Sequence, residues 1–186
     1  MLKREMTKSE IEKDLQGKGN FVQIDHLNRF LKEHHLSIDT RKFIFLKLAS
    51  LYEGSKLFGE AAKMYENAAG MSLTFAEKIK HYMVETDMYV KLGAFDRIDQ
   101  AVKKALSEAN SKEREDIQVS LKQMFKAQAA ALESEMKRNH AVKFYERILD
   151  MKLSDQERRE SKEKLLDLYK KTGKLHEALV LEKSLG

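Results

Sequence analysis

The chain has 186 residues, with no proline, only eight glycines and a formal net charge of +5 at pH 7. This length suits one compact domain or a short array of repeats, and the shortage of helix breakers favours long helices. The lack of cysteine excludes disulfides and thiolate metal sites. The sequence has neither a signal peptide nor a long apolar run. We therefore expect a cytoplasmic protein without a membrane segment.

Capping boxes and turn residues divide the chain into ten predicted helices. In a capping box, a short polar side chain and a glutamate three residues later satisfy each other's free backbone N–H groups at a helix start. The spacing occurs at Thr7 with Glu10, Thr74 with Glu77, Asn110 with Glu113 and Ser154 with Glu157. The predicted helices span residues 7–16, 20–35, 39–54, 57–70, 74–92, 95–108, 111–137, 139–151, 154–172 and 174–185. Short turns between them predict about five hairpins packed as one continuous domain.

A pattern of small and large residues recurs in the second helix of successive hairpins. Its copies begin at Ala61, Ile98, Ala141 and Ala178, at spacings of 37, 43 and 37 residues. Small residues at such positions let two helices approach closely, while the large ones fill the adjacent space. The recurrence predicts an all-α repeat protein.

The hairpin of residues 41–70 resembles the tetratricopeptide repeat. Its matching residues are Phe45, Leu48, Ala49 and Tyr52 in the first helix and Phe58, Ala61, Tyr65 and Ala68 in the second. The likeness continues more loosely through four hairpins over residues 39–186, with Glu85 where leucine is expected, and residues 1–38 are interpreted as a degenerate hairpin. The repeats exceed the family's length of about 34 residues, which makes them similar also to soluble NSF attachment proteins. The resemblance implies a right-handed solenoid of antiparallel hairpins.

In tetratricopeptide arrays the first helix of each hairpin lines a concave face that binds other proteins. The candidate partner-binding residues on this face are Phe43, Leu46, Lys80, Met83, Asp87 and Lys126. Phe43, Leu46 and Met83 would form an apolar seat for a peptide or partner helix. Alternatively, Phe43 and Leu46 pack in the core against the first hairpin. The lysine and asparagine residues with which chaperone-binding members hold a peptide carboxylate are missing from the matching positions, so such a clamp is not expected.

No catalytic, metal or cofactor site is predicted. Consecutive His34 and His35 would point about 100° apart on a helix, and His81 with Glu85 lacks a third ligand, so we interpret that pair as structural. RNA binding is the alternative function, but the evenly spread charge and the tyrosines at packing positions argue against it. We therefore expect a non-enzymatic scaffold or adaptor that binds a protein or peptide, as a monomer or weak homodimer.

Overall fold

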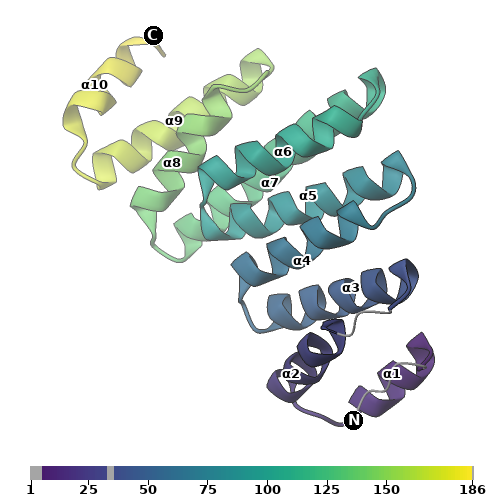
Figure 1. The fold of residues 1–186 in the computed structure, drawn as a ribbon. Coiled ribbons are helices and arrows are strands. Elements are labelled where there is room, and N and C mark those ends of the chain that lie inside the picture. Colours follow the sequence, from purple (N-terminus) through teal and green to yellow (C-terminus); the bar gives the residue numbers. More distant parts are fainter. Residues whose placement is uncertain (1–5, 33–35, 186) are drawn as a thin grey trace. The chain divides into compact units, whose positions relative to one another are not determined.

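The computed structural model describes residues 6–32 and 36–185, and within these ranges it contains ten α-helices and no strand (Figure 1). They are α1 (Lys8–Leu15), α2 (Asn20–Leu31), α3 (Ile38–Gly54), α4 (Phe58–Gly70), α5 (Phe75–Leu92), α6 (Phe95–Glu108), α7 (Ser111–Ser134), α8 (Arg138–Leu149), α9 (Asp155–Lys171) and α10 (Leu175–Lys183). The predicted all-α fold is confirmed, and each predicted helix has a counterpart whose ends differ by a few residues. His34 and His35 lie outside the described residues.

The predicted capping boxes lie at the starts of α1, α5, α7 and α9. Both reciprocal hydrogen bonds form at Thr7, Asn110 and Ser154. At Thr74 only half of the box is present: the Glu77 N–H donates to the Thr74 hydroxyl at 3.2 Å, whereas the Glu77 carboxylate binds Lys42 of α3. The helix starts are therefore specified locally, and Glu77 also makes a contact between helices.

The turns inside four hairpins share one backbone geometry. Each contains a residue with positive φ, namely Lys56 (58°), Gly93 (66°), Met136 (60°) and Gly173 (76°). The following residue donates a backbone hydrogen bond to the carbonyl five residues before it, as from Leu57 to Tyr52 at 2.8 Å. These turns are 37, 43 and 37 residues apart, which matches the spacing of the small-residue pattern. The first residue of each copy of that pattern is buried.

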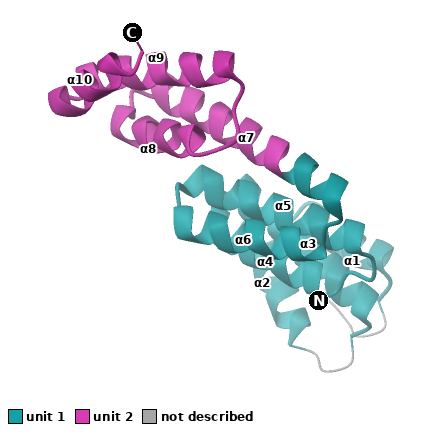
Figure 2. Cartoon of the chain, turned by 90° about the horizontal axis from the view of Figure 1, so that it is seen from above, with its two compact units in different colours: residues 1–117 teal, residues 118–186 magenta. Residues whose placement is uncertain are grey.

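The chain divides into two compact units, residues 1–117 and 118–186, with the boundary inside α7 (Figure 2). In the first unit α4 packs against α3 and α5, and α5 packs against α6. In the second unit α9 packs against α8 and α10. Phe125 of α7 meets Phe144 of α8 edge to face there, with ring centroids 5.5 Å apart.

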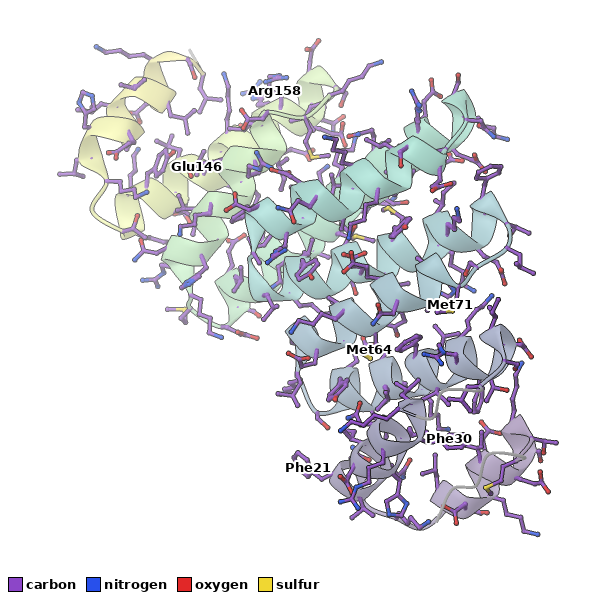
Figure 3. All side chains as sticks on the ribbon, in the orientation of Figure 1. Phe21, Phe30, Met64, Met71, Glu146 and Arg158 are labelled. Atoms are coloured by element: carbon purple, nitrogen blue, oxygen red, sulfur yellow. The ribbon has the colours of Figure 1, made fainter. Side chains whose placement is uncertain are left out.

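The N-terminal helices share a hydrophobic cluster with α3. Its buried members are Ile11, Leu15, Ile24, Leu27, Phe30, Ile44 and Leu48. Phe43 of α3 and Met64 of α4 are partly buried and pack against this cluster, whereas Phe21 is 76% exposed and points away from α2 (Figure 3). The position of Phe43 favours the alternative that this residue belongs to the core.

Candidate functional site

An ion pair links the first helices of successive hairpins at the same place in each unit. In the first unit the Lys42 Nζ of α3 lies 2.9 and 3.0 Å from the two carboxylate oxygens of Glu77 on α5. In the second unit the Lys122 Nζ of α7 lies 2.8 and 3.0 Å from those of Glu157 on α9. Lys122 and Glu157 stand 80 residues after Lys42 and Glu77, so positions at this offset are equivalent in the two units.

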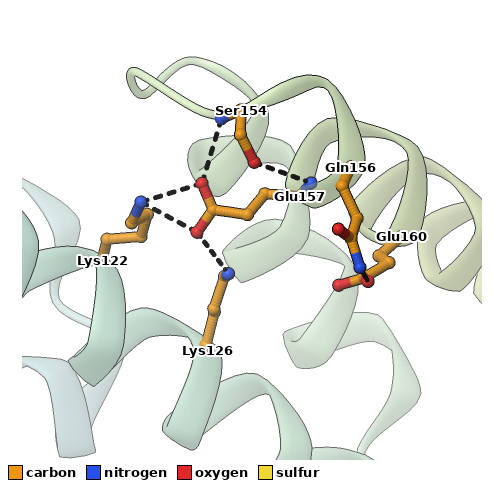
Figure 4. Close-up of polar contacts among 6 residues, drawn as sticks. All are labelled: Lys122, Lys126, Ser154, Gln156, Glu157 and Glu160. Carbon is orange, nitrogen blue, oxygen red and sulfur yellow. Dashed lines mark hydrogen bonds and ion pairs between the residues drawn. The ribbon is translucent and has the colours of Figure 1, made fainter.

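Glu157 is the centre of a polar network at the start of α9 (Figure 4). Besides Lys122, its carboxylate accepts hydrogen bonds from Lys126 at 2.9 Å and from the Ser154 backbone N–H at 3.0 Å. These hydrogen bonds hold the pKa of Glu157 well below its usual 4.5, and the bond from Lys122 has the largest effect. The network joins α7 to α9 and places Lys126, a predicted partner-binding residue, in an internal ion pair.

A pocket of about 570 Å³ lies on the surface formed by α7, α8 and α9 in the second unit. The residues that line this α7–α9 pocket are Lys126, Tyr145, Glu160, Ser161, Glu163, Lys164 and Asp167. Tyr145 is buried, and its hydroxyl donates a hydrogen bond to Glu133 at 2.7 Å. Burial raises the pKa of Tyr145 most, and the hydrogen bond to Glu133 raises it further. The tyrosine is therefore uncharged, and its hydrogen bond fixes the ring at the edge of the pocket.

The two lysines of the α7–α9 pocket pair with carboxylates outside its lining. Lys126 binds Glu157, and the Lys164 Nζ lies 3.8 Å from a Glu133 carboxylate oxygen. The positive charge of each lysine is therefore opposed by a neighbouring negative charge within the protein.

Among the described residues, the three carboxylates of the pocket contact only other side chains of α9. Glu160, Glu163 and Asp167 are exposed. Each contacts a partner four residues away on α9: Gln156 donates to Glu160 at 2.9 Å, Arg159 to Glu163 at 3.1 Å and Lys171 to Asp167 at 2.6 Å. Exposed pairs of this kind typically contribute only about 0.3–0.5 kcal/mol, so these carboxylates remain available to a ligand.

Ser161 brings an unbonded hydroxyl to the same pocket. Ser161 is only 4% exposed. No residue that the structure describes forms a hydrogen bond with the Ser161 hydroxyl. Among the described residues, the fully buried side-chain atoms without a partner are His26 Nδ1 and Glu85 Oε2. The Ser161 oxygen is not one of them, so it keeps some accessible surface and can bond to water or to a ligand in the pocket.

The equivalent surface of the first unit is less charged. The residues that stand 80 positions before the pocket lining are Leu46, Tyr65, Lys80, His81, Met83, Val84 and Asp87. Among them Leu46, Met83 and Val84 are partly buried, whereas Lys80 is exposed. Four of the six predicted partner-binding residues therefore occupy this surface, while Phe43 packs in the N-terminal core and Lys126 belongs to the second unit.

Ion pairs join α3 and α5 at both ends of this first-unit surface. Lys42 binds Glu77 near the helix starts, and Lys91 binds Glu53 at 2.9 Å near the helix ends. Lys91 also binds Asp87 at 2.9 Å, so the predicted Asp87 is paired within the protein. The two helices are thus parallel neighbours, with Leu46 and Met83 between the two ion pairs along their length.

His81 and Glu85 are both buried, as a structural interpretation requires, but no hydrogen bond joins them. Instead Glu85 Oε1 accepts a hydrogen bond from Lys104 of α6 at 2.8 Å, and its Oε2 has no partner. Burial raises the pKa of Glu85 in spite of Lys104, and it lowers that of His81. Within the described part of the chain, no group of three His, Cys, Asp or Glu residues could hold a metal ion.

Sequence reasoning missed the pocket role of Tyr145, Ser161 and Lys164. A signal was present in the 80-residue offset, at which Lys42 and Glu77 recur as lysine and glutamate. Alignment of the chain with itself at this offset would have indicated which surface the second unit shares with the first.

No protein-family model matches the chain, and a search of curated proteins finds no match. Along residues 6–32 and 36–185, no helix is both long and apolar enough to cross a membrane. The structure shows an all-α protein of packed helices, in which a lysine–glutamate pair recurs between the first helices of successive hairpins.

Proposed function

We propose that the protein is a non-enzymatic, tetratricopeptide-like interaction module of the cytoplasm that holds a peptide or a partner helix on its first helices. The observation that carries this proposal is the α3–α5 surface, where Leu46 and Met83 lie between two ion pairs. An apolar centre with a charged rim is the usual anatomy of a protein interface, because burial of the centre supplies affinity and the rim supplies specificity.

The tyrosines support a protein partner over RNA. Single strands are held by aromatic rings on which bases stack, together with clustered cations. Here the hydroxyls of Tyr65 and Tyr145 bond to Glu53 and Glu133 at 3.4 and 2.7 Å, which fixes the rings within their hairpins. Carboxylates beside these rings would also repel phosphate groups.

Site-specific photocrosslinking in the native cell tests the proposal. A benzoylphenylalanine at Lys80, exposed on α5, is expected to crosslink to a discrete protein, whereas one at Lys63 of α4, which is also exposed, is not. Met83→Asp should weaken the Lys80 adduct without loss of helicity by circular dichroism, because it places a charge in the apolar centre. Equal adducts from both positions would contradict the proposal, and a ribonuclease-sensitive adduct would support RNA binding instead.

A further inference from the structure

The α7–α9 pocket has the same place in its unit as the apolar α3–α5 surface, but a different chemistry. Glu160 replaces Lys80, Glu163 replaces Met83 and Ser161 replaces His81 at the 80-residue offset. We infer that this pocket binds the guanidinium group of an arginine in the partner peptide. The inference rests on the proposed function only in taking the ligand to be a peptide.

The charge of the pocket favours a cation. Three exposed carboxylates line it against two lysines. Lys126 is paired with Glu157 at 2.9 Å, whereas Lys164 is 60% exposed and lies 3.8 Å from Glu133. An anionic ligand would have to compete with Glu157 for Lys126. The carboxylates of Glu160, Glu163 and Asp167 would also repel it. A cationic ligand would displace only the solvent-exposed contacts that the three carboxylates make along α9.

The hydroxyl of Ser161 favours a ligand with several donors. A guanidinium presents five N–H groups in a planar fork, so it can bond to a carboxylate through two of them and still donate to a neighbouring oxygen. Ser161 lines the pocket on the same helix as Glu160 and Glu163, and its hydroxyl oxygen can accept a hydrogen bond. The volume of about 570 Å³ lies within the usual range for ligand pockets and leaves room for an arginine side chain with adjacent peptide.

Titration of the ¹⁵N-labelled full chain with single amino-acid probes, followed by NMR, tests the inference. Nα-acetyl-arginine amide is expected to give saturable shifts concentrated at Tyr145 and residues 157–167. The neutral isostere Nα-acetyl-citrulline amide should bind on the order of two- to fivefold more weakly, which is the effect of one exposed charge interaction. Nα-acetyl-glutamate amide should give no saturable shift.

Variants show which groups bind the probe. Glu163→Gln and Ser161→Ala should each weaken the arginine probe by roughly two- to fivefold, whereas Glu135→Gln, on the α7–α8 turn outside the pocket lining, should leave it unchanged. The inference is overturned if the glutamate probe shifts the same residues, or if the arginine shifts spread over the acidic surface without saturation. Arginine binding without a crosslinked protein would contradict the proposed function alone, and a crosslinked protein without arginine binding would contradict this inference alone.

Discussion

Replacement of Glu85 by leucine is expected to raise the free energy of unfolding by about 1–4 kcal/mol, the gain found when well-packed apolar residues replace buried ionic groups. Glu85 is 1% exposed and its Oε2 has no partner. A buried leucine contributes about 1.5–3 kcal/mol, and the equivalent position of the second unit already holds one, Leu165, which is 2% exposed. The change leaves Lys104 paired, because its Nζ also binds Glu66 at 2.6 Å.

Urea denaturation followed by circular dichroism measures this effect, with Lys104→Met as the matched control. That control should destabilise the protein, because it leaves the Glu85 carboxylate buried without its ion-pair partner. The pH dependence has a definite sign. Since burial raises the pKa of Glu85 above 4.5, ionisation of Glu85 opposes folding, and the advantage of leucine should shrink as the pH falls through the raised pKa. A destabilised Glu85→Leu variant at neutral pH, with an unchanged m-value, would refute the reasoning.

Three further predictions concern turns, caps and packing. Lys56→Gly should stabilise the protein by about 0.5–1 kcal/mol in urea melts, because glycine adopts positive φ without steric cost, and a loss of stability would contradict this account of the turn. Glu157→Gln should make the melting temperature less dependent on pH in acid. The pKa of Glu157 is lowered in the folded protein, so the stabilisation that its carboxylate gives is complete above pH 4.5 and is lost as the pH falls below that value. An unchanged pH profile of the melting temperature would contradict this prediction. Ala141→Leu should lower the free energy of unfolding by about 1–3 kcal/mol, because it overpacks a fully buried site. An unchanged melting temperature in calorimetry would contradict this prediction.

The helices were predictable because their signals are local. Caps at Thr7 and Ser154 and turns at Gly93 and Gly173 depend on contacts within a few residues, so sequence spacing locates the helix ends. Packing of Phe43 against the N-terminal hydrophobic cluster was left open, because an apolar helix face looks the same in the sequence whether it meets another helix or a ligand.

The candidate site was less predictable because its contacts are long-range. Lys126 was predicted to contact a partner, and that stays a prediction. Its ion pair with Glu157, 31 residues away, was not foreseen, because no local pattern indicates that pairing. Ser161 gives no local sequence signal, since a serine on a polar helix is ordinary. Only its burial beside a pocket makes it informative.

The 80-residue correspondence separates the residues that hold the hairpins together from those of the proposed binding surfaces. Lysine and glutamate keep the first helices in register in both units, at Lys42 with Glu77 and at Lys122 with Glu157. Between these fixed points, Met83 in one unit stands where the other has Glu163. On the proposed function, substitution of a few surface side chains would change what each unit binds, while the lysine–glutamate pairs between the first helices stay in place.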